Sequence, residues 1–497
     1  MRTAVLVATL AASACAVHAT PQRSSPQPSR AVRELRADLE RVFGAPIMDR
    51  GTWAVDVRSL DTGERLYSLN AGKLMMPASN MKILTLAAAA ERLGWDYRFT
   101  TTLETGGTVV NGVLHGDLIV RGHGDPTMNA RDGRADAVLS DWAQGLRAAG
   151  ISSIDGRILG DDQAFDDEGV GAGWAWDYLQ YGYAAPVGAL AFNESVATLT
   201  LSPGPAAADP VRLRLTPGSG FMVLNRAVTG TAGSDVTLDY RRHIDRATLE
   251  VTGSMPAESQ ETTRNVAVVN PTLFFAQAVK DGLAARGIAV SGEAADLDDV
   301  AAGLQAQGAP DRRVLVSTES PPLRDIGAVL MKVSQNLYAE TLLKALGAAD
   351  GGLGTAEGGR RAAQVALDAW SVPRDAYVMY DGSGLSRYNY LTAETVTTVL
   401  TRMHRDPRHH EPFVSTLPIA GADGTLASRL KRTRAERNAA AKTGSISNAR
   451  ALSGFVRSRD GEMLVFSILA NDFVIPAATV VWIIDLGVEI LSNFTRR

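Results

Sequence analysis

The first and last parts of the chain contain two patterns of apolar and polar residues, one typical of helices and one typical of strands. Apolar residues recur at helical spacing in residues 31–43, 323–346 and 480–494, which predicts amphipathic helices. Residues 53–57 and 65–69 are strand-like and flank an Asp-Thr-Gly turn. This arrangement is typical of an antiparallel hairpin.

The last third of the chain also contains both strand-like and helical patterns. Residues 452–456 and 463–469 are strand-like and flank an Arg-Asp-Gly turn, so we expect two adjacent antiparallel strands. Helical spacing occurs at residues 360–370 and 393–403. The closing helix over residues 480–494 contains two acidic residues and is short, which favours packing against the core over docking on a membrane.

The middle of the chain has a different pattern. Between about residues 99 and 312, short β-rich runs such as 117–122 and 197–201 are broken by Gly, Pro and Asp. Apolar residues at helical spacing are rare in this region, apart from residues 135–149 and 271–286. A single α/β unit does not need so long a stretch. The pattern predicts one or two inserted β-rich domains over residues 99–312.

The insertion divides the core into a first part over residues 31–98 and a second part over residues 313–497. The Ser-x-x-Lys, Ser-x-Asn and Lys-Thr-Gly motifs described below all lie outside the insertion. We therefore expect the flanking segments alone to assemble the chemical machinery.

The amino terminus predicts export. Residues 1–19 have a short positive start, a small apolar stretch and an Ala-x-Ala-like end, as in a secretory signal peptide. Residues 20–30 are rich in Pro, Ser and Gln and predict a disordered linker. Cys15 is the only cysteine; a lipoprotein form through Cys15 is the less favoured alternative to a cleaved, periplasmic protein.

Composition excludes several classes of function. The chain has 45% hydrophobic and 21% charged residues and a formal net charge of -4, as in an ordinary soluble protein. We see no basic stripe, so nothing indicates nucleic-acid binding. No later segment reaches the roughly 18 uninterrupted apolar residues of a membrane span. Without a cysteine in the mature chain, disulfides and a thiol nucleophile are excluded.

A possible nucleophile lies where a helix is expected to begin. Residues 77–82 read Pro-Ala-Ser-Asn-Met-Lys and precede a run rich in Ala and Leu that ends at Gly94, which predicts a helix. Ser79 and Lys82 are three residues apart, so their side chains share one face. A neutral amine at that distance can take the proton of a serine hydroxyl.

A Ser-x-x-Lys pair alone often occurs by chance, and two later motifs make the match at Ser79 and Lys82 specific. Ser334-Gln335-Asn336 and Lys442-Thr443-Gly444 follow in that order. The order Ser-x-x-Lys, Ser-x-Asn, Lys-Thr-Gly is the set found in penicillin-binding proteins and class A β-lactamases. A second Ser-x-x-Lys match, at Ser428 and Lys431, is out of order.

With its long insertion between the first two motifs, the chain resembles the class C low-molecular-mass penicillin-binding proteins, the D-alanyl-D-alanine carboxypeptidase/endopeptidase family. Residues 160–165, 173–177, 381–386 and 417–426 also look like this family. The resemblance implies an α+β fold with a β-lactamase/transpeptidase-like core, in which helices flank an antiparallel sheet, and β-rich inserted domains. It implies a serine peptidase that acts on peptidoglycan stem peptides through an acyl-enzyme and is inhibited by penicillin.

The resemblance also implies roles for individual residues. Ser79 is the expected nucleophile, Lys82 its base, and Ser334 a relay of the proton to the leaving amine. The expected substrate-binding residues are Asn336, Lys442, Thr443, Gly444 and Ser445, with the N–H groups of Ser79 and Ser445 forming the oxyanion hole. The expected partners are peptidoglycan peptides and β-lactams, and no cofactor is implied.

Asp161 is a weaker candidate. It could contact an amine of the stem peptide from the inserted region, but a surface-turn aspartate is the simpler interpretation. The seven histidines show no metal-ligand spacing, so no metal site is expected. No Gly-x-Ser-x-Gly elbow occurs, which argues against a Ser-His-Asp hydrolase.

Two alternatives stay open. A serine β-lactamase would use the same three motifs, usually without so long an insertion. A non-catalytic, penicillin-recognising wall-binding protein could keep the fold, although it would have little reason to retain Ser79, Lys82 and Lys442 together.

Overall fold

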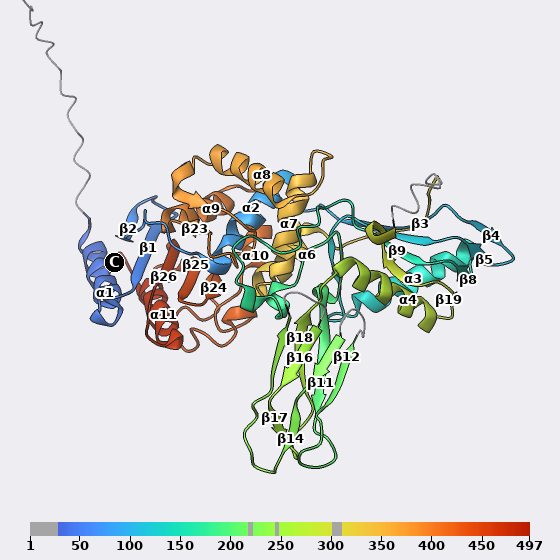
Figure 1. The fold of residues 1–497 in the computed structure, drawn as a ribbon. Coiled ribbons are helices and arrows are strands. Elements are labelled where there is room, and N and C mark those ends of the chain that lie inside the picture. The colour runs from blue at the N-terminus through green and yellow to red at the C-terminus, as the bar shows by residue number, and fades with distance from the viewer. Residues whose placement is uncertain (1–27, 217–221, 244–247, 301–310) are drawn as a thin grey trace, which may run out of the picture.

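The first and last parts of the chain together build one antiparallel sheet of five strands, shown on the left of Figure 1. The structure is a computed structural model that describes residues 28–216, 222–243, 248–300 and 311–497. The strands of the sheet, in spatial order, are β2 (Arg65–Leu69), β1 (Thr52–Ser59), β26 (Met463–Asn471), β25 (Ala449–Arg457) and β24 (Ala440–Ile446). Both predicted strand pairs, β1 with β2 and β25 with β26, are confirmed.

The sheet separates two hydrophobic cores, because successive side chains of a strand point to opposite faces. In β26, Leu464 and Phe466 belong to one core and Val465 to the other. Helices α1 (Arg30–Phe43) and α11 (Ala477–Asn493) complete the first core. The second core contains residues of α2 (Met81–Leu93), α6 (Leu323–Lys332), α7 (Asn336–Ala348), α8 (Ala356–Ala369), α9 (Ala393–Arg405) and α10 (His410–Thr416).

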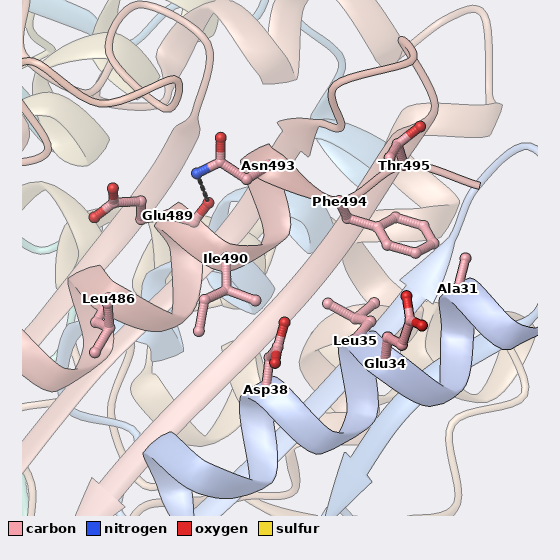
Figure 2. Close-up of a pocket in the computed structure, with 10 residues that line it drawn as sticks. All are labelled: Ala31, Glu34, Leu35, Asp38, Leu486, Glu489, Ile490, Asn493, Phe494 and Thr495. Atoms are coloured by element: carbon pink, nitrogen blue, oxygen red, sulfur yellow. Dashed lines mark hydrogen bonds between the residues drawn. The ribbon is translucent and has the colours of Figure 1, made fainter. Parts of the chain in front are cut away.

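Helices α1 and α11 lie side by side on the first face of the sheet (Figure 2). Their buried residues share one cluster, so the predicted packing of the closing helix against the core is confirmed. A hollow of about 320 Å³ lies between them, lined by Leu35, Ile490 and the carboxylates of Glu34, Asp38 and Glu489. Among the described residues, no helix is long and apolar enough to cross a membrane.

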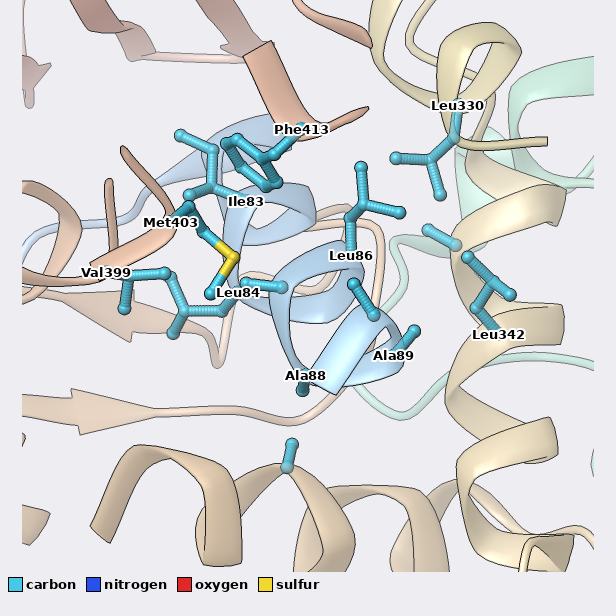
Figure 3. Packing of buried hydrophobic residues seen from close by; sticks show 14 of the residues in the cluster. Ile83, Leu84, Leu86, Ala88, Ala89, Leu330, Leu342, Val399, Met403 and Phe413 are labelled. Carbon is cyan, nitrogen blue, oxygen red and sulfur yellow. The ribbon is translucent and has the colours of Figure 1, made fainter. Parts of the chain in front are cut away.

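Helix α2 runs through the middle of the second core. Residues 81–90 are all buried, and Figure 3 shows helices on several sides of α2. The alanines at positions 87 to 90 allow neighbouring helices to approach closely, while Leu86 fills the space against Gly327 of α6. This packing fixes the helix that follows Ser79 directly in the chain.

The chain leaves and re-enters the core at one place. Strand β3 (Thr100–Thr105) pairs antiparallel with β21 (Arg313–Glu319), so the two ends of the middle segment are neighbours. These two strands belong to a five-stranded sheet. Its spatial order is β20 (Ala294–Asp296), β9 (Ile158–Asp161), β6 (Leu118–Gly122), β3 and β21. An insertion whose ends are adjacent can be large without separating the two halves of the core.

Further strands and helices of the middle segment form the right-hand and lower parts of Figure 1. The predicted runs at residues 117–122 and 197–201 are confirmed as strands, and those at 135–149 and 271–286 as helices. They are β6 (Leu118–Gly122), β11 (Val196–Ser202), α3 (Arg134–Ala148) and α4 (Pro271–Ala285). The domain boundaries at residues 99 and 312 stay a prediction.

The helix expected over residues 323–346 is wrong in one respect. It is broken between α6 and α7, and Ser334 in the break has a left-handed φ of 63°. The side chain of Gln335 accepts a hydrogen bond from the backbone N–H of Leu337, which caps the start of α7. Hydrophobic periodicity continues through the break, because both helices face the same core.

The predicted signal peptide at residues 1–19 lies outside the described residues, as does the predicted linker at residues 20–30 except for its last three residues. Of these, Ser29 accepts a hydrogen bond from the backbone N–H of Val32 and so caps α1. A cap of this kind satisfies one of the unpaired N–H groups of the first turn. The described part of the chain therefore begins with a capped helix.

We expect Leu86→Ala to lower the free energy of unfolding by about 2–5 kcal/mol, because the side chain is fully buried against α6 and leaves a cavity. Urea unfolding followed by circular dichroism measures the change. Val365→Ala on α8 is the control, since Val365 is 70% exposed and its loss should cost less than about 0.5 kcal/mol. Equal losses of stability in the two variants would contradict the burial of Leu86 and of α2 in the second core.

Candidate active site

Ser79 lies in a short 3₁₀ turn, η2 (Ala78–Asn80), that leads directly into α2. The turn is held from outside by Gly384, whose α-carbon packs against the backbone of Ala78. A Cβ on Gly384 would lie 1.8 Å from the Ala78 carbonyl oxygen, and Gly384 has a φ of +85°. Ala78 itself has a left-handed φ of 47°. Close backbone packing therefore fixes the position of the Ser79 hydroxyl.

The side-chain nitrogen of Lys82 is buried and has three polar neighbours. It lies 3.0 Å from Ser79 Oγ, 2.6 Å from Asn336 Oδ1 and 2.8 Å from the Ser383 carbonyl oxygen. A neutral amine has two N–H donors and one lone pair. The Asn336 and Ser383 oxygens can take the two hydrogens, which leaves the lone pair to accept the Ser79 proton.

The electrostatics favour that neutral form. Burial lowers the pKa of Lys82 from 10.5 to about 7, although the carboxylates of Glu340 and Asp381 act in the opposite direction. Burial and the nearby charge of Lys82 also hold the pKa of Lys442 well below its usual value. Two ammonium groups close together in a region of low dielectric disfavour each other. Near pH 7 the site can therefore exchange a proton.

Ser334 faces Lys442 from the break between α6 and α7. Its hydroxyl oxygen lies 2.8 Å from Lys442 Nζ. The left-handed φ of Ser334 (63°) is uncommon for a residue with a side chain and costs of order 1 kcal/mol or more. The break brings the second motif to the third, which a continuous helix would not do.

Thr443, Gly444 and Ser445 lie on β24, the edge strand of the five-stranded sheet. An edge strand leaves one row of N–H and C=O groups for an added peptide. Gly444 lets the chain before Ser79 approach, since a Cβ there would lie 2.7 Å from the Pro77 carbonyl oxygen. The Thr443 hydroxyl donates to the Thr425 hydroxyl at 2.8 Å.

These residues enclose one cleft with a volume of about 380 Å³. All three predicted motifs line it. Its lining residues are Ser79, Tyr178, Tyr183, Ser334, Asn336, Gly384, Leu385, Thr425, Thr443, Ser445, Ile446 and Ser447. We name this space the active-site cleft. Lys82 and Lys442 lie beneath it, buried, with their nitrogens against Ser79 and Ser334.

The insertion takes part in the cleft, so the expectation that the flanking segments alone assemble the machinery is wrong. Tyr178 and Tyr183 come from the inserted region and line the cleft. The amide of Asn336 donates to the Tyr183 carbonyl oxygen at 2.7 Å. That bond orients the Asn336 side chain so that its oxygen faces Lys82. No sequence pattern around Tyr183 indicates this contact.

The sequence analysis missed a buried carboxylate, Glu340, which holds the loop whose Ser383 carbonyl contacts Lys82. Glu340 accepts hydrogen bonds from the backbone N–H groups of Gly382 at 2.9 Å and Ser383 at 2.7 Å. Burial, helped by the charge of Asp381, raises the pKa of Glu340 to about 7. Glu340 follows Asn336 by four residues on α7 and therefore lies on the same helix face. An acidic residue four positions after the Asn of the second motif is the feature of the sequence that points to Glu340.

Asp381 holds the other end of the same loop. Its carboxylate accepts from the backbone N–H groups of Gly384 and Ser386, at 2.8 and 2.6 Å. It also accepts from the indole N–H of Trp174 at 2.9 Å and the amide of Asn389 at 2.6 Å. A buried carboxylate with this many donors is a structural anchor, and it fixes the loop that carries the Ser383 carbonyl.

Asp161 does not line the active-site cleft, and its interpretation as a surface-turn residue is wrong. It ends strand β9 (Ile158–Asp161) and is only 2% exposed. Its carboxylate accepts from Arg312 Nη1 at 2.5 Å and from the backbone N–H of Gln163 at 3.3 Å. Burial with a paired guanidinium makes Asp161 a structural residue of the insertion.

Two groups of side chains elsewhere among the described residues have the composition of a metal site. Glu91, Asp406 and His409 form the first group, where His409 Nδ1 accepts from Trp95 and Arg408 pairs with both carboxylates. The second consists of the carboxylates of residues 162, 296 and 298, each held by a neighbouring polar side chain. Neither group lines the active-site cleft.

Comparison with known proteins agrees with the family resemblance that the sequence indicates. Residues 35–489 match the D-Ala-D-Ala carboxypeptidase 3 (S13) family. The chain is 35% identical over 456 residues to a D-alanyl-D-alanine carboxypeptidase of Actinomadura sp., covering 89% of this chain and 82% of that protein. It is 26% identical over 428 residues to the D-alanyl-D-alanine carboxypeptidase DacB of Haemophilus influenzae, covering 84% of each.

A solved structure confirms the predicted fold class. The crystal structure of penicillin binding protein 4 from Haemophilus influenzae superposes with a TM-score of 0.79 and 24% sequence identity. The superposition covers 92% of this chain and 99% of that one. The fold is therefore that of a transpeptidase-like core carrying the long middle segment.

We expect Gly384→Ala to abolish the reactivity of Ser79 with an acylating reagent, because the added Cβ displaces the Ala78 backbone. Gly94→Ala is the matched control: Gly94 has a φ of +83° but nothing within 4 Å of an added Cβ. Both variants should lose stability of about 1–3 kcal/mol from the positive φ. Intact-mass spectrometry measures labelling, and equal labelling of the two variants would contradict the proposed packing.

Proposed function

Because this chain belongs to the D-Ala-D-Ala carboxypeptidase 3 (S13) family, we propose that it removes the terminal D-alanine from peptidoglycan stem peptides through an acyl-enzyme on Ser79. One observation carries the proposal. Ser79 with Lys82, and Ser334 with Lys442, are two hydrogen-bonded pairs that meet at one cleft. A structural or binding role alone gives no reason to bury two lysines against two serines.

In the first half of the reaction, neutral Lys82 takes the hydroxyl proton as Ser79 Oγ attacks the carbonyl carbon of the penultimate residue. The carbonyl electrons move to oxygen, and the N–H groups of Ser79 and Ser445 stabilise that negative charge. The carbon–nitrogen bond then breaks. The leaving amine receives a proton by way of Ser334, and the acyl group stays on Ser79 as an ester.

The substrate is held through its terminal carboxylate. Lys442 and Thr443, with Thr425 beside them, offer an ammonium and two hydroxyls for it. When the carboxylate binds, its charge also favours the protonated form of Lys442. Water then hydrolyses the ester, which releases the shortened peptide and returns the hydroxyl to Ser79.

The same geometry supports inhibition by penicillin, whose strained amide and carboxylate match the cleft. The carboxylates of Glu340 and Asp381 act on Lys82, but each accepts hydrogen bonds from two backbone N–H groups. Neither is arranged to activate water for rapid deacylation. We therefore infer a long-lived penicillin adduct, which disfavours the β-lactamase alternative. With the signal peptide that the sequence predicts, we expect this activity in the periplasm.

We expect the purified protein to release D-alanine from a stem pentapeptide and Ser79→Ala to release none, since the ester cannot form without the hydroxyl. Chromatography of the products measures the release. Penicillin should add one adduct mass to the Ser79 peptide of the wild-type protein. Labelling at Ser428, or rapid multiple turnover of penicillin, would contradict the assignment.

We expect the acylation rate to rise with pH up to about 7, at about tenfold per pH unit, and to level off above it. Lys82 acts as a base only when neutral, and its pKa of about 7 sets the turning point. Stopped-flow acylation by a fluorescent penicillin gives the profile.

Lys82→Arg provides the control for this interpretation. Arginine keeps the positive charge but stays protonated at working pH. The variant should therefore lose roughly a hundredfold or more in acylation rate, the usual contribution of general-base catalysis. A wild-type rate in Lys82→Arg would exclude Lys82 as the base.

A further inference from the structure

Glu340 is a buried carboxylate that has no part in the reaction steps described above. It lies on α7 and is only 6% exposed. One of its oxygens accepts a hydrogen bond from the Gly382 N–H at 2.9 Å, and the other accepts one from the Ser383 N–H at 2.7 Å. An ionised carboxylate only accepts hydrogen bonds, so a donor on each oxygen suits the charged form. A charge buried in this way needs a compensating group.

Ser383 connects this carboxylate to the proposed base. Its N–H donates to Glu340, and its carbonyl oxygen accepts from Lys82 Nζ at 2.8 Å. Lys82 Nζ in turn lies 3.0 Å from Ser79 Oγ. One line of hydrogen bonds therefore runs from the nucleophile, through the amine and the backbone of one residue, to the carboxylate.

The loop that carries Ser383 is held on two sides. The Gly382 carbonyl oxygen accepts a hydrogen bond from the hydroxyl of Thr85 on α2 at 2.7 Å. On the other side Gly382 packs against α7, since a Cβ there would lie 2.6 Å from the Ala339 carbonyl oxygen. The direction of the Ser383 carbonyl is therefore determined by this packing and by the hydrogen bonds to Glu340.

Four buried ionisable groups act on one another here: the amines of Lys82 and Lys442 and the carboxylates of Glu340 and Asp381. Burial lowers the pKa of Lys82 to about 7, while the two carboxylates act in the opposite direction, Glu340 more strongly than Asp381. The charges of the two amines disfavour each other. Loss of the Glu340 charge would therefore make Lys82 neutral at a lower pH and weaken it as a base.

The charge of Lys82 acts on Glu340 in return. Burial and the charge of Asp381 raise the pKa of Glu340 to about 7, and the hydrogen bonds from Ser383 and Gly382 oppose that rise. An ammonium on Lys82 favours the ionised carboxylate, just as the carboxylate favours the ammonium. When Lys82 takes the Ser79 proton, Glu340 is therefore placed to balance the new positive charge.

We propose that Glu340 is a positioning residue for Lys82, which aims the Ser383 carbonyl at the amine and stabilises the ammonium that forms when Lys82 takes the Ser79 proton. The acid of a Ser-His-Asp triad has the same two tasks toward its base. The proton moves from Ser79 Oγ to Lys82 Nζ, and Glu340 stays ionised throughout. The proposal rests on the acyl-enzyme function proposed above and adds a residue to its proton transfer.

We expect Glu340→Gln, which removes the charge but keeps the size, to change the pH profile of acylation in two ways. The rate on the plateau should fall roughly tenfold to a hundredfold, the usual effect of losing hydrogen bonds to a charged group. The turning point should move to lower pH by about one unit or more, because the lost carboxylate favoured the protonated amine. Stopped-flow acylation by a fluorescent penicillin measures both changes, and circular dichroism confirms that the variant is folded.

Glu340→Asp separates position from charge. The shorter side chain keeps the carboxylate but draws it away from the N–H groups of Gly382 and Ser383. The plateau rate should fall, while the turning point stays within about half a pH unit of the wild type. If Glu340→Gln does not fold, this variant supplies the test, since an unchanged plateau rate in Glu340→Asp would overturn the proposal.

Asp161→Asn is the matched control, because Asp161 is also a buried carboxylate that accepts from a backbone N–H but lies outside the active-site cleft. Its plateau rate should stay within about twofold of the wild type, with the same turning point. A turning point in Glu340→Gln that equals the wild-type value would overturn the proposal, whatever the plateau rate. Failure of the wild-type protein to acylate at Ser79 would overturn the proposed function itself.

Discussion

The burial of one amine, that of Lys82, is the constraint on which the active-site cleft depends. A buried ammonium is costly, so the protein must surround it with polar oxygens or lower its pKa, and here it does both. The oxygens come from Ser79, Asn336 and Ser383, which lie in three distant parts of the chain. The pKa of Lys82 is therefore lowered only when these three parts of the chain have packed around α2 and buried the amine.

Residues with a positive φ also occur around that amine. Ala78 and Ser334 have left-handed φ values, and Gly384 has a positive φ that only glycine adopts easily. The hydrophobic packing of α2, α6 and α7 supplies the stability that holds these residues in place. Glu340 links the two features, since it lies on α7 and binds the N–H groups of the loop that faces Lys82. The rigid core and the reactive site are thus parts of one arrangement.

The sequence predicted the parts whose signal is local. The β1–β2 hairpin, the β25–β26 pair and helix α2 follow from short-range periodicity. The motif order singled out Ser79, Lys82, Ser334 and Lys442 as candidates, and the structure brings these four side chains together in two hydrogen-bonded pairs. The break before α7 was missed because the same core faces both helices, so the periodicity does not change. The Tyr183–Asn336 bond and the burial of Asp161 were missed because they depend on contacts between residues about 150 positions apart.

The insertion has a physical reason to touch the site. Its two ends, β3 and β21, are paired, so it can vary in size without disturbing the core sheet. Yet its Tyr183 carbonyl fixes the rotamer of Asn336, and Asn336 in turn contacts Lys82. A contact made with the insertion near Tyr183 can therefore reach the amine of Lys82 through one side-chain amide. Binding energy from remote parts of a substrate contributes to turnover when it is linked to the reacting groups in this way.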